Sequence, residues 1–319
     1  MATAYPINWN IPLVRSIVAW GLLTTIAMAA PLIGADPLIP PEVSARAVVL
    51  MNPSSNQILY AKEPHLRLPP ASTTKVLTAL IALEHLNLNT KVPAGSRVLN
   101  VEPSRIGLQP GDVVYAQDLL YGLLLKSGND AAETIAEAIG GSVPGFAQIM
   151  NARAWRIGAR DTHFVNPHGL PDDRHYTTAY DLALIFRYAM NNPTFAEIVR
   201  THDATLRIES PQVGSSNTDA RLVSVHNTNR LLASYEGARG GKTGFTRAAR
   251  NCFVGEASRG EIRLVVAVLG SAGKVAVWQD VRALLDYGFA LYGLTSADKT
   301  VAAPSVSPTP LALQGNQGE

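Results

Sequence analysis

Cysteine is almost absent from this chain of 319 residues, which contains Cys252 and no other. A single cysteine excludes an intramolecular disulfide and a zinc site made of several thiolates. Cys252 is followed by the apolar residues Phe253 and Val254. We therefore expect it in a buried strand, as a packed side chain rather than a reactive thiol.

Charge is scarce as well: only 16% of the residues are charged, and 27 basic residues nearly balance 25 acidic ones. Nucleic-acid binding requires an excess of basic residues clustered on one face, so we expect no nucleic-acid partner. The hydrophobic fraction of 47% predicts a packed core and excludes a largely disordered or fibrous chain. Lysine is rare, with 7 residues against 20 arginines, so each lysine inside a motif is informative.

Residues 16–35 carry no charge, and Arg15 precedes them. An apolar stretch that ends in a small-x-small site is typical of an export signal, and Ala27-Met28-Ala29 supplies that site. The alternative is an uncleaved anchor, because about twenty apolar residues span a bilayer. Both interpretations place the rest of the chain in a bacterial periplasm or on the outer face of the cytoplasmic membrane. The membrane would be contacted only through residues 1–35, and only if this segment is not cleaved.

The rest of the chain runs from strands through helices to strands. Runs of apolar and β-branched residues predict a hairpin at residues 46–52 and 57–62. One apolar stripe, uninterrupted by glycine or proline, predicts a helix from Thr73 to Leu86. Further helices are expected at residues 116–126, 131–139, 146–157, 179–190 and 275–291. Further strands are expected at residues 205–209, 220–225, 240–246, 252–257 and 262–269.

These elements predict one discontinuous α/β domain over residues 36–295. The early hairpin can complete its sheet only by pairing with the late strands, which leaves the intervening helices as an insert. The expected fold class is thus an antiparallel sheet flanked by helices, with an all-helical insert. Residues 296–319 have the proline-rich composition that is typical of a disordered tail.

Ser72 and Lys75 form a Ser-x-x-Lys motif at the start of the predicted helix. Serine is a poor nucleophile until a neighbouring group removes its proton, and residues three apart share one helix face. Lys75 can act as that base if burial and a second cation lower its pKa from about 10.4 towards 7. The plain alternative is an N-capping serine followed by a solvated lysine. The spacing alone does not distinguish a catalytic pair from this alternative, because Ser271 and Lys274 form a second Ser-x-x-Lys pair.

Two shorter motifs follow along the chain. Ser127-Gly128-Asn129 offers a hydroxyl that can relay a proton and an amide that can hold a substrate peptide bond, but alone it is equally a helix-capping turn. Lys242-Thr243-Gly244 offers a cation and a hydroxyl for a carboxylate, and a glycine that lets substrate backbone approach. Its alternatives are a plain strand and a phosphate-binding loop. The preceding glycines are one residue short of that loop's spacing, and no helix pattern follows.

Ser-x-x-Lys, Ser-x-Asn and Lys-Thr-Gly in this order resemble the signature of the serine β-lactamase and penicillin-binding-protein superfamily. Four longer segments, at residues 69–79, 119–132, 166–170 and 241–246, are similar to the low-molecular-weight D-alanyl-D-alanine carboxypeptidases. The likeness covers about residues 46–294. It implies a β-lactamase-like or DD-peptidase-like fold, with no metal or organic cofactor.

The resemblance also implies the residues of the acyl-transfer step. Ser72 would be the acylated nucleophile, Lys75 its general base, and Ser127 the relay of a proton to the departing D-alanine. The backbone N–H groups of Ser72 and Phe245 would form the oxyanion hole. Water would then free the acyl-enzyme, and β-lactams would act as covalent inhibitors of the same serine.

A second group of residues would hold the substrate, a peptidoglycan stem peptide that ends in D-Ala-D-Ala. Asn129 would hold its amide, and Lys242 and Thr243 would bind its terminal carboxylate, with Lys242 also lowering the Lys75 pKa. Gly244 and Phe245 belong to the same segment and would adjoin the substrate backbone.

Other functions stay open at this point. Short relatives include D,D-endopeptidases, which cut peptidoglycan cross-links. A class A β-lactamase needs a glutamate between the second and third motifs, and residues 138–196 contain none. A non-catalytic protein that only binds β-lactams or peptidoglycan is a further alternative. A zinc peptidase could use His163, His168 and His175, but they lack the His-Glu-x-x-His helix, so we expect structural or surface histidines.

Several charged residues have no place in the motifs. Arg250 stands where the resembling family has a glycine, and Glu256 where it has a small residue; the two would either alter the cleft rim or pair with each other. Asp130, Glu133 and Asp181 are expected to be helix caps and helix-surface charges rather than acids in the reaction.

Overall fold

The computed structural model of the protein describes residues 38–211 and 218–295. The predicted leader and the predicted tail lie outside these residues. Among the helices of the described residues, none is both long enough and apolar enough to cross a membrane.

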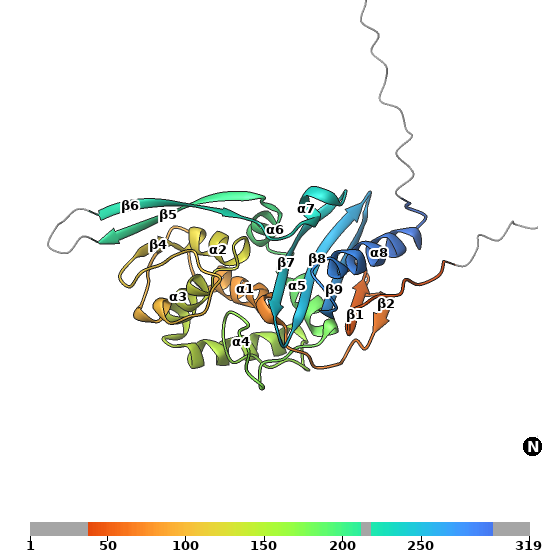
Figure 1. Ribbon diagram of the computed structural model, residues 1–319, viewed down its shortest axis with the longest axis horizontal. Coiled ribbons are helices and arrows are strands. Elements are labelled where there is room, and N and C mark those ends of the chain that lie inside the picture. Colours follow the sequence, from red (N-terminus) through yellow and green to blue (C-terminus); the bar gives the residue numbers. More distant parts are fainter. Residues whose placement is uncertain (1–37, 212–217, 296–319) are drawn as a thin grey trace, which may run out of the picture. The chain divides into compact units, whose positions relative to one another are not determined.

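The main sheet of the described residues is antiparallel, with strand order β2-β1-β9-β8-β7 (Figure 1). Its strands are β1 (Ala47–Met51), β2 (Ile58–Lys62), β7 (Ala238–Thr246), β8 (Arg250–Arg259) and β9 (Ile262–Ser271). β1 pairs with β9 along its whole length, from Ala47 opposite Leu269 to Met51 opposite Val265. The early hairpin therefore completes its sheet with the late strands, as the sequence predicts, and β7 is left at an edge.

Helices cover both faces of this sheet. The α-helices are α1 (Lys75–His85), α2 (Ala116–Leu124), α3 (Asn129–Gly140), α4 (Val143–Ile157), α5 (Ala179–Ala189), α6 (Pro193–Arg200), α7 (Leu231–Ser234) and α8 (Ala276–Ala290). Two 3-10 turns, η1 (Ala71–Thr74) and η2 (Ser96–Leu99), complete the helical elements of the described residues. α8 lies on one face of the sheet, and α5 lies on the other (Figure 1).

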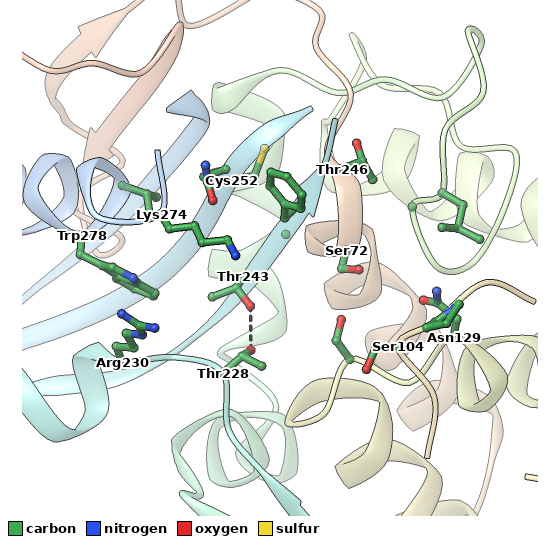
Figure 2. Close-up of a pocket in the computed structure, with 18 residues that line it drawn as sticks. Ser72, Ser104, Asn129, Thr228, Arg230, Thr243, Thr246, Cys252, Lys274 and Trp278 are labelled. Atoms are coloured by element: carbon green, nitrogen blue, oxygen red, sulfur yellow. Dashed lines mark hydrogen bonds between the residues drawn. The ribbon is translucent and has the colours of Figure 1, made fainter. Parts of the chain in front are cut away.

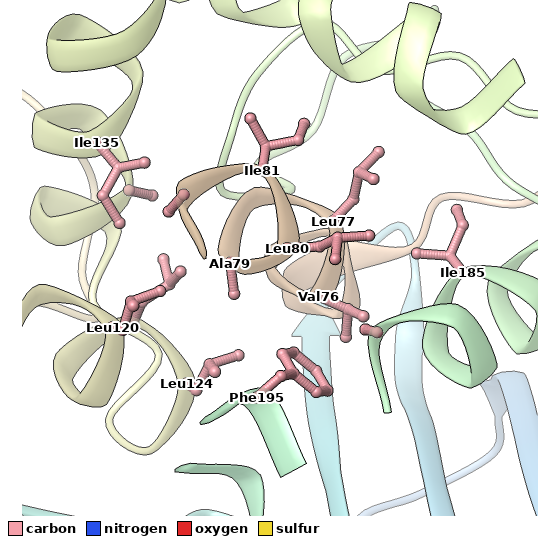
Figure 3. Close-up of a cluster of buried hydrophobic side chains, with 14 of the residues drawn as sticks. Val76, Leu77, Ala79, Leu80, Ile81, Leu120, Leu124, Ile135, Ile185 and Phe195 are labelled. Atoms are coloured by element: carbon pink, nitrogen blue, oxygen red, sulfur yellow. The ribbon is translucent and has the colours of Figure 1, made fainter. Parts of the chain in front are cut away.

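The core has two apolar layers, one on each face of the sheet. Strand β1 serves both, because Val49 packs towards α5 and its neighbour Val48 packs towards α8. Helix α1 lies inside the larger layer, where Leu77 and Ile81 are surrounded by apolar side chains of the neighbouring helices (Figure 3). A helix enclosed in this way cannot tilt without opening cavities, so the residues at its N-terminus are held in place.

The insert is not all-helical, and this part of the predicted fold class is wrong. The predicted strands at 205–209 and 220–225 lie in β5 (Asp203–Pro211) and β6 (Thr218–His226), which belong to a second antiparallel sheet of order β3-β4-β5-β6. Its other members are β3 (Lys91–Pro93) and β4 (Val113–Tyr115). Only β3 and β4 were not predicted, because strands of three residues are too short to produce an alternating pattern.

Several helices also differ from the prediction: α7 has no predicted counterpart, and α4 begins at Val143, three residues before the predicted start at 146. α6 is absent from the predicted elements, although Asn192 caps it and Pro193 occupies its first turn; its eight residues are too few for a clear apolar period. α3 begins at Asn129, two residues before the predicted start at 131. The amide of the second motif therefore stands on the first turn of a helix instead of in the preceding loop.

Candidate active site

Ser72 lies in η1, directly before α1. The preceding residue, Ala71, has a φ of 49°, a left-handed conformation that is uncommon for a residue with a side chain. Two glycines make room for this turn. A Cβ atom on Gly169 would lie 1.9 Å from the Ala71 carbonyl oxygen, and one on Gly244 would lie 2.9 Å from the Ser72 nitrogen. Gly244 thus admits the Ser72 turn itself, which the sequence analysis did not anticipate when it assigned this glycine to the substrate.

The Lys75 side chain is fully buried and reaches back to Ser72. Its Nζ lies 3.0 Å from Ser72 Oγ, 2.6 Å from Asn129 Oδ1 and 2.8 Å from the His168 carbonyl oxygen. A neutral amine has two N–H groups and one lone pair. Asn129 Oδ1 and the carbonyl oxygen can only accept, so they take both N–H groups and leave the lone pair facing the Ser72 hydroxyl.

The electrostatics of the site favour this neutral amine. Burial lowers the pKa of Lys75 well below its usual value, the charge of Lys242 lowers it further, and Asp130 partly opposes the change. Burial also lowers the pKa of Lys242, to about 7. The structure thus brings together the serine, the lysine and the second cation that the sequence analysis singled out.

The second motif lies across the cavity from β7, with Ser72 between Asn129 and Thr243 (Figure 2). Asn129 Nδ2 donates to the Glu102 carbonyl oxygen at 2.7 Å, which turns Oδ1 towards Lys75. Ser127 has a φ of 66° and lines the cavity in front of Ser72. Its hydroxyl makes no hydrogen bond with another described residue, so it is available to a molecule bound in that cavity.

The third motif lies on edge strand β7, where neighbouring side chains face opposite ways. Lys242 is 1% exposed and its Nζ donates to the Thr243 carbonyl oxygen at 2.9 Å. Thr243 lines the cavity, and its hydroxyl shares a hydrogen bond of 2.7 Å with that of Thr228 (Figure 2). Phe245 lines the same cavity and is 57% exposed. The wall of the cavity therefore presents the hydroxyl, and the ammonium of Lys242 lies beneath it.

The cavity in front of Ser72 has a volume of about 400 Å³. Figure 2 shows Ser72 between Thr243 on one side and Ser104 and Asn129 on the other. All three motifs thus meet around one opening, although they are separated by up to about half of the chain.

Beyond Thr243, the cavity wall contains residues that the sequence analysis did not assign. Lys274, Trp278 and Arg230 lie there (Figure 2), and neither cationic head group pairs with another described residue. No carboxylate is among the residues that line the cavity. Such a cavity attracts anions. Lys274 is the lysine of the second Ser-x-x-Lys pair. Its side chain lines this cavity, whereas Ser271, the serine of that pair, does not.

Arg250 and Glu256 do not pair with each other, contrary to one of the alternatives above. Both lie on β8, where residues six apart are separated by about 20 Å. Glu256 is buried and pairs with Arg239 at 2.7 Å, whereas Arg250 is exposed where β8 begins.

Three acidic residues that were expected as caps or surface charges are instead buried, so the expectation of surface charges is wrong. Asp130 accepts hydrogen bonds from three backbone N–H groups of the loop at 106–108. Glu133 contacts His168 and the residue Arg97. Asp181 lies in the first turn of α5, where its carboxylate accepts from a backbone N–H group of a neighbouring loop.

The expectations for Cys252 and the histidines hold. Cys252 is buried in β8, and burial raises the pKa of its thiol to about 12. His168 and His175 are buried and hydrogen-bonded to neighbouring groups, and His163 is half-buried. Cys252 contributes to the lining of the cavity (Figure 2), but its raised pKa keeps the thiol protonated and thus a poor nucleophile.

Comparison with known proteins supports the same interpretation. A sequence model of the D-alanyl-D-alanine carboxypeptidase family, peptidase S11, matches residues 35–273. The chain is 42% identical to D-alanyl-D-alanine carboxypeptidase DacB2 of Mycobacterium tuberculosis, over 79% of this chain and 84% of the relative. It is 33% identical to D-alanyl-D-alanine carboxypeptidase DacF of Bacillus subtilis, over 82% of this chain and 67% of that relative.

Solved structures agree with the sequence comparison. The crystal structure of the Streptomyces K15 DD-transpeptidase aligns with a TM-score of 0.74 at 34% identity, over 79% of this chain and 99% of that one. The D-alanyl-D-alanine carboxypeptidase structure from Mycobacterium tuberculosis aligns with a TM-score of 0.71 at 39% identity, over 80% and 95%. The predicted DD-peptidase-like fold class is thereby confirmed. With this fold, three motifs around one cavity and a matching family model, the chain belongs to the peptidase S11 family of D-alanyl-D-alanine carboxypeptidases.

Proposed function

We propose that this protein is a serine-type D-alanyl-D-alanine carboxypeptidase, which removes the terminal D-alanine from peptidoglycan stem peptides. One observation carries the proposal: the buried Lys75 amine faces the Ser72 hydroxyl at 3.0 Å. The family assignment supports the reaction, and it does not favour an endopeptidase or a β-lactamase.

Acylation begins when Ser72 Oγ attacks the carbonyl carbon between the two D-alanines. Lys75 Nζ accepts the hydroxyl proton through its lone pair, while Asn129 Oδ1 and the His168 carbonyl hold its two N–H groups. The negative charge that develops on the substrate oxygen would be stabilised by the backbone N–H groups of Ser72 and Phe245. Such a pair of donors typically lowers the barrier by several kcal/mol.

The substrate carboxylate would bind on the Thr243 side of the cavity. Thr243 offers a hydroxyl there, and Lys274 and Arg230 add cationic groups on the same side. Lys242 lies beneath this wall, where its charge contributes to the field without direct exposure. Asn129 would contact the substrate amide, and Gly244 keeps β7 close enough to Ser72 for the carbonyl to reach both sides.

Loss of D-alanine requires that its nitrogen gain a proton as the C–N bond breaks. Ser127 lines the cavity with a hydroxyl that has no other described partner, so it can pass the proton from Lys75 to the leaving nitrogen. Water then attacks the ester carbonyl and releases Ser72. A β-lactam would acylate the same serine, because its strained amide presents a carbonyl and a carboxylate to the same groups.

The test is to incubate purified protein with defined muropeptides and to identify the products by mass. We expect free D-alanine from pentapeptides, and no product from the Ser72→Ala variant. Penicillin should add one adduct mass to the wild-type protein, located on the peptide that contains Ser72. Monomers released from cross-linked dimers, without D-alanine release, would contradict the carboxypeptidase assignment.

We also propose that residues 36–295 are the catalytic domain and that they act outside the cytoplasmic membrane. The uncharged run at residues 16–35 after Arg15 supports export, and the proposed substrate is a component of the cell wall. Mass analysis of the mature protein from cells would test this. A mass that lacks the first residues up to Ala29 indicates cleavage, whereas full-length protein in the cytoplasmic fraction would contradict export.

A further inference from the structure

The His168 imidazole takes no part in the proposed chemistry, yet it is 6% exposed and fully hydrogen-bonded. Its Nδ1 lies 3.2 Å from the Leu170 backbone nitrogen, which can only donate, so Nδ1 is the acceptor. The proton of the neutral ring is therefore on Nε2, which donates to Glu133 Oε1 at 3.0 Å. Burial lowers the pKa of His168, and this favours the neutral ring.

Glu133 connects this ring to the rigid part of the insert. It lies on α3 one turn after Asn129, and its side chain is 5% exposed. Its second oxygen accepts from Arg97 Nε at 2.9 Å, and the Arg97 side chain is 56% exposed. α3 thus supplies both an amide to Lys75, through Asn129, and a carboxylate to the histidine behind it.

The main-chain carbonyl of the same histidine is an acceptor for Lys75. The short loop around it is fixed at several points: Asn166 Oδ1 accepts from the Gly169 backbone nitrogen at 2.7 Å, and Thr78 Oγ1 donates to the Pro167 carbonyl at 2.6 Å. These two contacts lie on either side of residue 168, and the His168 backbone nitrogen also donates to Asn166 Oδ1 at 3.3 Å. The imidazole of His168 makes two further contacts: Nδ1 accepts from Leu170 within the same loop, and the Glu133 hydrogen bond ties the ring to α3.

We propose that Glu133 is a positioning residue for acylation: it holds the His168 imidazole so that the His168 carbonyl aims the Lys75 lone pair at Ser72. This inference rests on the proposed function, because it requires Lys75 to be the base. Glu133 acts here as a hydrogen-bond acceptor and not through its charge. Replacing Glu133 with a side chain that cannot accept a hydrogen bond should misalign the Lys75 amine without changing the pKa of Lys75.

The groups around Lys75 allow misalignment of its amine to be distinguished from a change in its pKa. The charges that shift its pKa are Lys242 on β7 and Asp130 on α3, and burial is the largest cause. His168 interacts electrostatically with Glu133, Arg97, Lys75 and the buried His175. A variant at position 133 leaves Lys242, Asp130 and the burial in place. In a variant that lacks the Glu133 acceptor, the midpoint of the acid limb of the pH–rate profile should therefore be unchanged, while the plateau rate falls.

The experiment measures the second-order rate of acylation by a fluorescent penicillin between pH 5 and pH 10. Glu133→Leu removes the acceptor, and we expect its plateau to fall at least tenfold, with the acid limb within about 0.3 pH units of wild type. Glu133→Gln keeps an acceptor oxygen without the charge and should stay within about threefold of wild type. An equal loss in both variants, or a shifted limb with an unchanged plateau, would show a charge effect and overturn the proposal.

Glu137→Leu is the matched control. Glu137 lies one turn further along α3 and also approaches Arg97, at 3.9 Å, but it has no hydrogen bond to His168. It should acylate at the wild-type rate. If it loses as much activity as Glu133→Leu, general damage to α3 explains both results and the proposal fails.

A second pair of variants decides the matter if Glu133→Leu does not fold. His168→Gln can still place an N–H group near Glu133, whereas the shorter side chain of His168→Asn cannot reach it. We expect the glutamine variant to acylate at least fivefold faster than the asparagine variant; equal rates would overturn the proposal. If penicillin never labels Ser72 in the wild-type protein, the proposed function itself is refuted. If labelling occurs at the same rate in wild type and in the variants at position 133, only this inference is refuted.

Discussion

At the scale of single residues, the site depends on what surrounds one lysine nitrogen. Ser72, Lys75 and Asn129 could be identified from the sequence, because their residue types and order are distinctive. The His168 carbonyl could not, because every residue has a carbonyl and no pattern marks the one that meets Lys75. The burial of Glu133 could not be predicted either, since a helix pattern alone does not show that a neighbouring loop will cover a carboxylate.

Replacing the amide of Asn129 by a carboxylate tests the neutral state of Lys75. Asn129→Asp would place a negative charge 2.6 Å from Lys75 Nζ, at the position of the present Oδ1. An opposite charge at this distance favours the protonated lysine and raises its pKa by roughly one to three units. Acylation should therefore fall sharply at neutral pH and recover as the pH is raised, because the base works only when deprotonated. The measurement is the pH profile of penicillin acylation.

Asn151→Asp is the control for this change. Asn151 also ties a loop, through hydrogen bonds of 2.8 Å with both backbone groups of Phe164, but it has no contact with Lys75. This variant should lose stability without moving the acid limb. An acid limb that is the same in Asn129→Asp as in wild type would contradict a base at position 75.

At the scale of elements, the sequence predicted most helices and the strands of the main sheet, because each has a long enough apolar period. Two strands of the second sheet, β3 and β4, were not predicted, since they are three residues each. The geometry of the turn before α1 was not predicted either. This geometry depends on β7 and on the loop around Gly169 pressing against Ala71, and close approach between distant segments leaves no local pattern.

Alanine substitutions at Gly169 and Gly141 distinguish the effect of steric crowding from that of backbone strain. Both glycines have positive φ, 85° and 67°, but a Cβ on Gly169 would meet the Ala71 carbonyl, whereas one on Gly141 would meet nothing within 4 Å. Gly141→Ala should cost about 1 kcal/mol of unfolding free energy, from strain alone. Gly169→Ala should cost more than this and should also slow acylation, because it pushes the His168 loop away from the Ser72 turn. Denaturant unfolding and the acylation rate check the two effects; equal behaviour of both variants would contradict the crowding at Gly169.

At the scale of the whole molecule, the fold gathers residues from three distant segments because strands from the start and the end of the chain share one sheet. The sequence predicted that closure from the lone early hairpin. The wall of cations beyond Thr243 was not predicted, since Arg230 and Lys274 belong to no common motif and meet only through the sheet closure. Two buried lysines also oppose folding, and this cost is a property of the whole protein.

Lys242→Met should make the protein more stable and much less active. The unfolded chain holds the Lys242 proton up to its ordinary pKa of 10.5, whereas the folded protein releases it at about 7. Unfolding therefore takes up a proton between these values, so the cost of Lys242 is complete below pH 7 and vanishes above about pH 10.5. The expected gain is up to about 4 kcal/mol at neutral pH. Denaturant unfolding at pH 7 and pH 10 should show the gain shrinking.

The exposed residue Lys126 provides the comparison, since Lys126→Met removes the same charge from a position that is not buried. Its effect on stability should be small at both pH values. A Lys242→Met variant that is less stable than wild type at pH 7 would mean that the buried amine has partners that compensate for its burial.

The most direct test of the account is the titration of Lys75 itself. In protein labelled with ¹³C-lysine, the Cε signal of Lys75 can be assigned by its loss in Lys75→Arg and followed from pH 5 to pH 11. We predict a midpoint well below 10.5 and a higher midpoint in Lys242→Met. A Lys75 midpoint at or above 10.5 would contradict a lysine base and, with it, the proposed mechanism.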